Sequence, residues 1–375
     1  MSDQPFTGLP DLAARTLGGS VAYASDELFA ERENLIKPGP PVFSPDAYGP
    51  KGKVYDGWET RRRREPGHDY ALIRLGAPGI IRGVVADTSF FTGNYPAEVS
   101  VEAAGVEGYP SPAELADACW ATIVPRSPVE PDARNAFEVG DTRRYTHVRL
   151  AIYPDGGVAR LRVHGQVVPD PRYLTGTVDL AATENGGVID GCSDMFYSSA
   201  ANLIQPGRAA TMADGWENAR RRDDGNDWVT VRLAVPGRLR RAELDTSCFI
   251  GNAPGSARLS GTASVRDGAW FELLPRTRLQ PDTRHRFLVG GGRPVALVRL
   301  DVYPDGGMAR LRLWGEPDPA ARGAAAARWL DSLPAAHAAR VLQDAGVAPR
   351  RAREIAAVTD GRWDLVPDAA RIVGA

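Results

Sequence analysis

The sequence predicts an all-β protein in which two β-sandwich or jelly-roll modules follow one another and are followed by a short helical tail. Three observations support this prediction. Four blocks of residues occur twice in the same order, short strand-like runs lie between glycines and prolines, and the residues after about 320 are rich in alanine. A chain of 375 residues also exceeds the usual size of one compact core, so two domains are expected.

The repeated blocks define the two modules. Each module contains, in order, a Ser-Asp pair with a later NLI, a DGWE with an arginine run, a DTS with FxGNxP, and a YPDGG inside a longer matching stretch. In the first module these blocks lie at 25–36, 56–64, 87–96 and 149–165. In the second module they lie at 193–204, 214–222, 245–254 and 299–315. We therefore expect modules over 16–168 and 184–316, with a helical extension over 320–375.

The residues within each copy are typical of strands. Runs such as 70–75 and 229–233 are short and bounded by glycine and proline. The PDGG at 154–157 predicts a tight turn, because proline presets φ and glycine tolerates a positive φ. After this turn, apolar and polar residues alternate as in a strand with one polar face. Trp58 and Trp216 should occupy equivalent buried positions, since matched blocks require matched packing.

The tail has a helical pattern. Alanine-rich runs favour helix, and Trp329, Leu330 and Leu333 fall at helical spacing. Pro334 interrupts this pattern, so we expect two or more short helices rather than one. The tail is too short for a catalytic domain, which favours a role in packing or in oligomer contacts.

Charge and composition indicate a small ligand. The formal net charge of −2 gives no long-range field for nucleic acid or an anionic membrane. No apolar stretch approaches the roughly 20 residues that span a bilayer, and the first residues do not resemble a secretory signal. The three cysteines are far apart and form no CxxC pair, which predicts reduced thiols. We expect a cytoplasmic protein without nucleic-acid or membrane partners.

The duplicated, ordered blocks resemble those of the allantoicase family over roughly residues 15–316. A single YPDGG would be weak evidence, whereas the complete set in duplicate is specific. The resemblance implies two jelly-roll modules related to galactose-binding-type domains, and a homo-oligomer is expected. It also implies hydrolysis of allantoate to (S)-ureidoglycolate and urea in the salvage of purine-derived nitrogen.

The chemistry of allantoate indicates which side chains such a site requires. Allantoate carries one carboxylate and two neutral ureido groups on one carbon. An arginine fork can bind the carboxylate bidentately. Release of urea requires a proton on the departing nitrogen and activation of water or of the remaining ureido group, which Asp, Glu or His can supply.

The candidate site residues come from the repeated blocks. The candidate catalytic residues are Asp26, Glu59, His68 and Asp87. The candidate substrate-binding residues are Arg62, Arg63, Thr88, Asn94, Arg160, Arg221, Asp245 and Asn252. His68 has Asn226 as its counterpart, and this difference between matched halves favours the first module as the active one.

Each group of candidates also has a structural interpretation. Asp87 and Asp245 could cap local backbone in turns. The arginine runs could form a solvated strand face with one member in a buried salt bridge. The two tryptophans are better explained as core residues than as ligand-stacking ones.

Alternative functions remain open at this point. The sequence contains no HExxH, G-x-S-x-G, Walker or GxGxxG motif, and its histidines are not spaced as zinc ligands. No metal site is assigned, although carboxylate and amide oxygens leave a divalent cation such as Mn²⁺ or Ca²⁺ open. The main alternative is a non-catalytic tandem β-sandwich protein that binds a sugar or another small molecule. A third hypothesis makes one module catalytic and the other structural.

Overall fold

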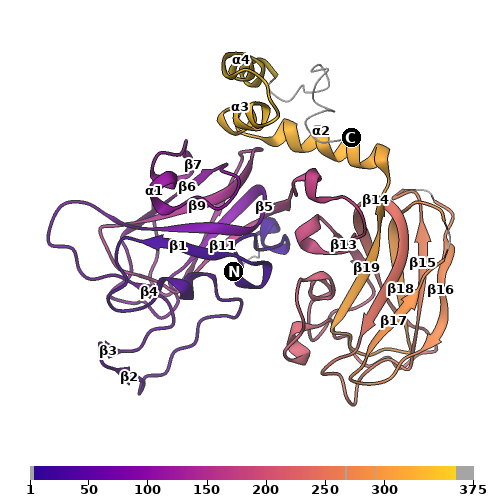
Figure 1. Ribbon diagram of the computed structural model, residues 1–375. Coiled ribbons are helices and arrows are strands. Elements are labelled where there is room, and N and C mark those ends of the chain that lie inside the picture. Colours follow the sequence, from indigo (N-terminus) through magenta and orange to yellow (C-terminus); the bar gives the residue numbers. More distant parts are fainter. Residues whose placement is uncertain (1–3, 267, 291, 360–375) are drawn as a thin grey trace. The chain divides into compact units, whose positions relative to one another are not determined.

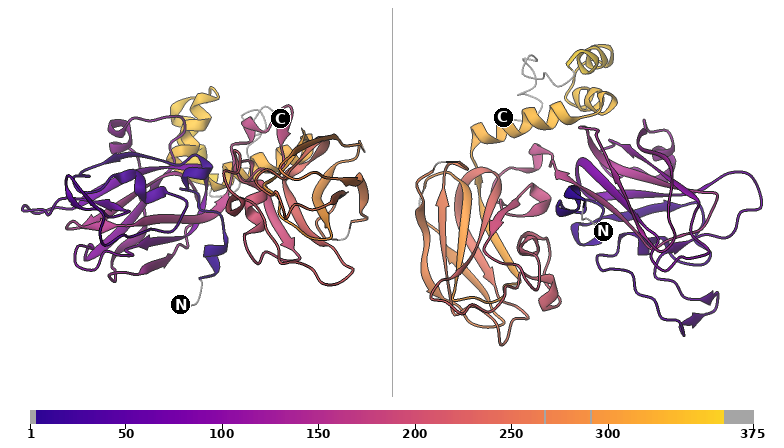
Figure 2. Two further views of the ribbon diagram at one scale, coloured as in Figure 1. Left: turned by 90° about the horizontal axis from the view of Figure 1, so that it is seen from below. Right: turned by 180° about the vertical axis from the view of Figure 1, so that it is seen from behind.

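The computed structural model describes residues 4–266, 268–290 and 292–359 (Figure 1). The chain forms two compact units. The first unit contains the residues up to Val168 together with the described residues from Trp329 onward, and the second contains Pro169–Arg328. Each unit is built around antiparallel β-sheet, which confirms the predicted all-β class with two tandem modules (Figure 2).

The first unit contains a main sheet with strand order β1-β5-β9-β6-β7. These strands are β1 (Ser20–Ala24), β5 (Asp69–Asp87), β9 (Arg144–Tyr153), β6 (Glu98–Ala104) and β7 (Ala121–Pro128). The strands β8 (Arg134–Glu138) and β11 (Arg160–Val167) also pair with β5. Two short pairs complete the unit: β4 (Trp58–Glu59) with β10 (Gly157–Val158), and β2 (Tyr48–Gly49) with β3 (Gly52–Lys53). The helix α1 (Pro112–Ala116) precedes β7.

The second unit repeats this arrangement with strand order β12-β19-β14-β18-β15-β16. These strands are β12 (Val178–Asp179), β19 (Arg310–Pro317), β14 (Asp227–Asp245), β18 (Val295–Tyr303), β15 (Ser256–Thr262) and β16 (Phe271–Arg278). The strands β13 (Val188–Cys192) and β17 (Arg284–Leu288) also pair with β14. Short 3-10 helices occur at Pro5–Gly8, Arg15–Leu17, Arg32–Ile36, Pro171–Tyr173, Thr183–Asn185, Ala200–Ile204 and Met212–Asp214.

One 19-residue strand in each unit connects the layers of the sandwich. The first half of β5 pairs with β9, and its second half pairs with β11 and β8. The register shifts between Arg74 and Gly79, where the strand passes from one set of partners to the other. β14 does the same in the second unit, with its shift between Arg232 and Gly237. The carboxyl ends of both strands carry the repeated DTS block.

The predicted burial of the two matched tryptophans is confirmed. Trp58 and Trp216 are fully buried, and each belongs to the hydrophobic core of its own unit. Each indole Nε1 donates a 2.8 Å hydrogen bond to a backbone carbonyl, that of Asp26 or that of Asp194. The polar end of each ring is therefore satisfied inside the core, as a buried indole requires.

In each sandwich the YPDGG turn contacts the phenylalanine of the FxGNxP block. A Cβ on Gly157 would lie 2.0 Å from the Phe91 ring, and one on Gly307 would lie 1.9 Å from the Phe249 ring. The YPDGG turn thus packs directly on the phenylalanine of FxGNxP, and no larger residue fits between them.

Up to Thr359, where the described residues end, the tail forms three short helices, α2 (Pro319–Ser332), α3 (Ala335–Asp344) and α4 (Pro349–Thr359), as the break at Pro334 predicted. From Trp329 onward the described helices belong to the first unit, and α3 packs beside α4. Trp329 is fully buried, and its ring lies 5.9 Å from the guanidinium of Arg144. Arg144 donates to Glu107 (2.6 Å), which also contacts His337 of α3 (3.2 Å). The rest of the predicted extension, residues 360–375, lies outside the described residues.

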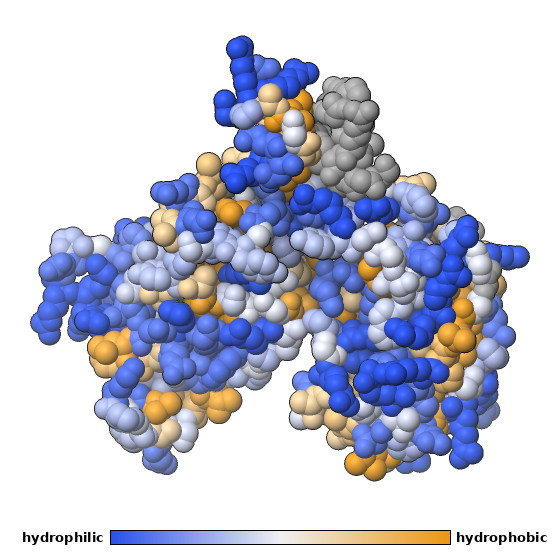
Figure 3. All heavy atoms as spheres, in the orientation of Figure 1, coloured by the Kyte–Doolittle hydropathy of each residue, from blue (hydrophilic) through white to orange (hydrophobic). Residues whose placement is uncertain are grey.

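The surface carries mixed polar and apolar residues. On the face shown in Figure 3, hydrophilic residues cover most of the surface and apolar residues form small patches. No helix among the described residues is long and apolar enough to cross a membrane.

Candidate functional site

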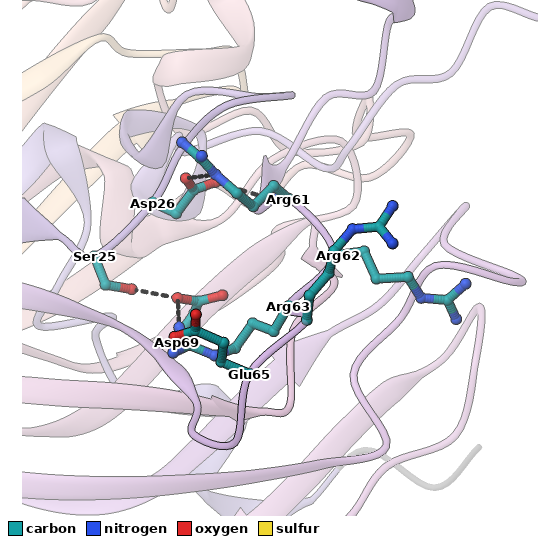
Figure 4. A pocket seen from close by; sticks show the side chains of 8 residues that line it. Ser25, Asp26, Arg61, Arg62, Arg63, Glu65 and Asp69 are labelled. Atoms are coloured by element: carbon teal, nitrogen blue, oxygen red, sulfur yellow. Dashed lines mark hydrogen bonds and ion pairs between the residues drawn. The ribbon is translucent and has the colours of Figure 1, made fainter.

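A cleft of about 570 Å³ in the first unit gathers the arginine run of the DGWE block. We call it the arginine cleft. Its lining residues are Ser25, Asp26, Arg61, Arg62, Arg63, Arg64, Glu65 and Asp69 (Figure 4). Three of the candidates from the sequence, Asp26, Arg62 and Arg63, therefore lie together here.

Arg63 is held by an ion pair at the base of this cleft. Its Nη1 lies 2.8 Å from Oδ1 of Asp69, a carboxylate that also accepts a 2.9 Å hydrogen bond from Ser25. The backbone N–H of Arg63 donates to Asp155 in the YPDGG turn (2.8 Å). Arg63 therefore joins three of the repeated blocks, and its guanidinium is already engaged by protein.

The second unit contains the same network. Arg221 donates to Asp227 (2.6 Å), and Ser193 donates to the same carboxylate oxygen (2.8 Å). The backbone N–H of Arg221 donates to Asp305 (2.6 Å). Hydrogen bonds with Asp223 and Asp227 raise the pKa of Arg221, so this arginine is a fixed cation.

Two other arginines of the cleft are not held by a carboxylate of the described residues. Arg62 and Arg64 are exposed, and among the described residues neither has a hydrogen-bond or ion-pair partner. In Figure 4 the side chain of Arg62 extends away from Asp69. An unpaired guanidinium keeps its full set of N–H donors for an anion.

Asp26 closes the other side of the cleft. It accepts from the backbone and from Nε of Arg61, at 2.8 and 2.6 Å, and from the backbone N–H of Leu28. Burial acts to raise the pKa of Asp26, but these hydrogen bonds lower it overall. Asp26 is therefore an ionised carboxylate at neutral pH.

Glu59 and Asn94 form a half-buried pair that the second unit repeats. Asn94 donates to Glu59 (2.6 Å), and Asn252 donates to Glu217 (2.5 Å). Burial raises the pKa of Glu59, and the hydrogen bond from Asn94 offsets only part of this effect. A carboxyl group of this kind can hold a proton closer to neutral pH than an exposed one.

The candidates at the end of β5, and Arg160 at the start of the adjacent strand β11, have mainly backbone partners. Asp87 accepts from the N–H of Ser89 (2.9 Å), and buried Thr88 donates to the carbonyl of Glu130 (2.6 Å). Buried Arg160 donates to several carbonyls and to the carboxylate of Asp56 (2.6 Å). These residues do not line the arginine cleft.

The remaining candidates differ in their surroundings. Exposed His68 lies beside Tyr153, with ring centroids 4.9 Å apart, and does not line the cleft. Its counterpart Asn226 donates to Asp301 (3.0 Å). Asp245 accepts from Ser247 (2.8 Å), as Asp87 does from Ser89 in the first unit.

A second pocket of about 410 Å³ contains Asp245 and residues that the sequence did not single out. Arginines and carboxylates line it together, among them Glu184, Arg208, Glu243 and Arg312. Glu184 and Arg208 lie outside the four repeated blocks, which explains why repeat matching missed them. A position-by-position comparison of the modules shows that both are charged residues absent from the first module, but only the fold shows that they share a cavity. Among the described residues, no three His, Cys, Asp or Glu side chains are grouped as a metal site.

Comparisons with known proteins identify the family. A family model described as the allantoicase repeat matches residues 10–168 and 178–318. A probable allantoicase from Nocardia farcinica is 59% identical over 315 residues, covering 83% of this chain and 95% of that protein. One from Streptomyces coelicolor is 53% identical over 86% of this chain and 90% of its own length. The crystal structure of an allantoicase from Saccharomyces cerevisiae matches with a TM-score of 0.70 and 36% identity, covering 82% of this chain and 93% of that one. The chain belongs to the allantoicase family.

Proposed function

We propose that this chain hydrolyses allantoate and releases ureidoglycolate and urea. The observation that carries the proposal is the 59% identity to a probable allantoicase over 83% of the chain. Relatives with this name do not favour the alternative of a non-catalytic sugar-binding protein.

The arginine cleft of the first unit supplies the carboxylate anchor. Arg62 is the main contact, because its guanidinium is exposed and has no partner among the described residues. Arg63 and Asp69 keep the floor of the cleft in place through their 2.8 Å ion pair. A free arginine fork next to a fixed one is suited to a planar carboxylate.

Proton transfer is assigned to acidic and imidazole groups of the same unit. When the C–N bond breaks, the departing ureido nitrogen takes up a proton and becomes urea, and water supplies the hydroxyl group of ureidoglycolate. Glu59 is suited to donate this proton because burial raises its pKa. His68, Asp26 and Asp87 are the other groups proposed for proton exchange and water activation. Thr88, Asn94 and Arg160, with Arg221, Asp245 and Asn252 of the second unit, stay proposed as substrate-binding residues.

The test is urea production by the purified chain. Allantoate is added, and urea and ureidoglycolate are measured over time, with no added protein and heat-inactivated protein as controls. Equal amounts of the two products are expected. If no urea forms above the controls, the proposed function is wrong.

We also propose a homo-oligomer in the cytoplasm. Met195, Phe196 and Tyr197 are consecutive exposed apolar residues, at 56, 72 and 66% exposure, and such segments are typical of interaction surfaces. The three cysteines form no disulfide, which suits a reducing compartment. Light scattering after gel filtration measures the mass, and a monomer at micromolar concentration would overturn the oligomer.

A further inference from the structure

The second pocket is built from several separate elements of the second unit. β14 contributes Glu243 and Asp245, β19 contributes Arg310 and Arg312, and the loop after 206 contributes Arg208. The short 3-10 helix Thr183–Asn185 contributes Glu184. Cations and carboxylates therefore line the same cavity of about 410 Å³.

The cationic side has unused donor groups. Arg310 donates through Nη1 to the carbonyls of Asp214 (2.6 Å) and Ala309 (2.7 Å), and through Nε to that of Gly207. Its Nη2 has no partner among the described residues. Arg208 is exposed and equally unpaired in the described part of the chain.

The first unit shows why these donors are free. There, Nη2 of Arg160 binds the carboxylate of Asp56 (2.6 Å). The counterpart of Asp56 is Asp214, whose carboxylate instead accepts from the backbone N–H groups of Ala210 and Thr211, at 2.9 Å each. The same arginine is thus neutralised in one unit and left with an open donor in the other.

The acidic side has an unused acceptor. Oε2 of Glu184 is buried and has no hydrogen-bond partner within the described part of the chain. A buried polar atom without a partner is costly, and a ligand N–H group would remove that cost. Burial also raises the pKa of Glu184. Glu243 differs, because Arg284 (2.8 Å) and Arg286 (3.1 Å) already neutralise it.

The first unit lacks the groups that make this pocket distinctive. The repeat places Thr16 at the position of Glu184, Pro40 at that of Arg208 and Val85 at that of Glu243. The scaffold arginines Arg160 and Arg310 occur in both. The extra charged groups are therefore additions to the second unit and are not required by the fold.

We propose that this pocket binds a small carboxylate that also carries urea or amide N–H groups. Arg208 and the free Nη2 of Arg310 bind the carboxylate, and Glu184 accepts a hydrogen bond from the ureido N–H. The choice of ligand class rests on the proposed function, whereas the site is additional to the arginine cleft. Each chain then has two places for ureido acids, one in each unit.

Isothermal titration with carbamoylglycine, a stable compound with one carboxylate and one ureido group, tests the proposal. Arg208→Ala removes an exposed cation, and Glu184→Thr introduces the residue that the first unit tolerates at this position. Each variant should weaken binding at one site by about 10- to 100-fold, as expected for a lost charge-assisted contact. Arg62→Ala should weaken binding only in the arginine cleft, so the binding event that Arg208→Ala and Glu184→Thr weaken should keep its affinity in this variant.

Arg238→Ala is the matched control, because Arg238 is exposed on β14 and does not line the pocket. Circular dichroism melting curves check that every variant folds. The proposal is overturned if the unaltered chain does not bind carbamoylglycine, or if Arg208→Ala and Glu184→Thr both bind it as the unaltered chain does. Failure to release urea from allantoate would refute the proposed function and leave this binding result intact.

Discussion

The two units share their internal networks and differ in the side chains around them. Both contain the Ser–Asp–Arg network, in which Arg63 or Arg221 is held by a buried carboxylate. Both contain a buried tryptophan that donates to a backbone carbonyl. The first unit has Arg61 in contact with Asp26, whereas the second has Ala219 at that position. The second unit has Glu184 where the first has Thr16.

This comparison separates residues that build the sandwich from those that contact a ligand. The Ser–Asp–Arg network and the buried tryptophan occur twice with nearly the same distances and are explained by the needs of the fold. A charged residue that occurs once, at the edge of a cavity, is not required by that fold. The differences between the units are therefore the best guide to binding and catalysis.

The largest expected effect tests whether the first unit alone is catalytic. His68→Asn makes the units alike at this position, and loss of an acid–base group lowers rates by roughly 10²–10⁴-fold. Urea release should fall by this factor, while folding survives because the second unit has Asn226 there. Asn226→His serves as the reciprocal variant and should change activity little. Full activity in His68→Asn, combined with its loss in Asp245→Asn, would place the active site in the second unit.

The next largest effect tests the shared network. Asp69→Asn and Asp227→Asn each weaken a charge-assisted contact to a fixed arginine, which should cost about 1.5–3 kcal/mol of unfolding free energy. The carboxylates are buried and their partners are similar, so the two losses should agree within about 1 kcal/mol. Denaturant unfolding measures both values. A large loss for one and none for the other would show that the networks are not equivalent.

A smaller effect on kcat/KM tests whether Arg62 binds allantoate while its counterpart Arg220 does not. Arg62→Ala should lower kcat/KM for allantoate by about 10- to 100-fold, because a bidentate contact to the carboxylate is lost. Arg220→Ala should leave kcat/KM within about twofold, and neither variant should change stability appreciably, since both side chains are exposed. Equal losses in the two variants would argue for a site in each unit.

The smallest effect concerns Glu107, which the first unit alone possesses. Burial acts to raise the pKa of Glu107, but the hydrogen bond with His337 and the charge of Arg144 lower it to about 2. Because the folded pKa is depressed below 4.5, this contribution to stability is present above pH 4.5 and is lost as pH falls toward 2.

Glu107→Gln should therefore cost about 1 kcal/mol near pH 7, because the carboxylate is partly exposed and screened. The difference between the variant and the unaltered chain should shrink as pH falls below 4.5. Thermal melting between pH 7 and pH 3 measures it. A difference that stays constant over this range would mean that the ion pair does not stabilise the first unit.

Repeats and turn residues were sufficient to predict the β-sandwich class, the buried tryptophans and the helical tail. They predicted the arginine run as a site because arginine suits a carboxylate, but they did not identify which arginine was free. That distinction depends on Asp69, which lies six residues beyond Arg63 and meets it only after β5 forms. The second pocket was missed because Glu184 and Arg208 come from unmatched segments that the fold brings to one cavity. Side-chain partners of this kind depend on tertiary structure and leave no local pattern.

The docking of Trp329 near Arg144 has a consequence for synthesis on the ribosome. Arg144 is completed early, but the indole beside it is made only after the entire second unit has been translated. Domains generally fold in the order in which they emerge from the ribosome. The first sandwich therefore folds before Trp329, whose ring packs beside the fully buried Arg144, has been made. A nascent chain arrested before residue 329 should therefore expose Arg144 to solvent and to protease, and completion of the last helices should protect it.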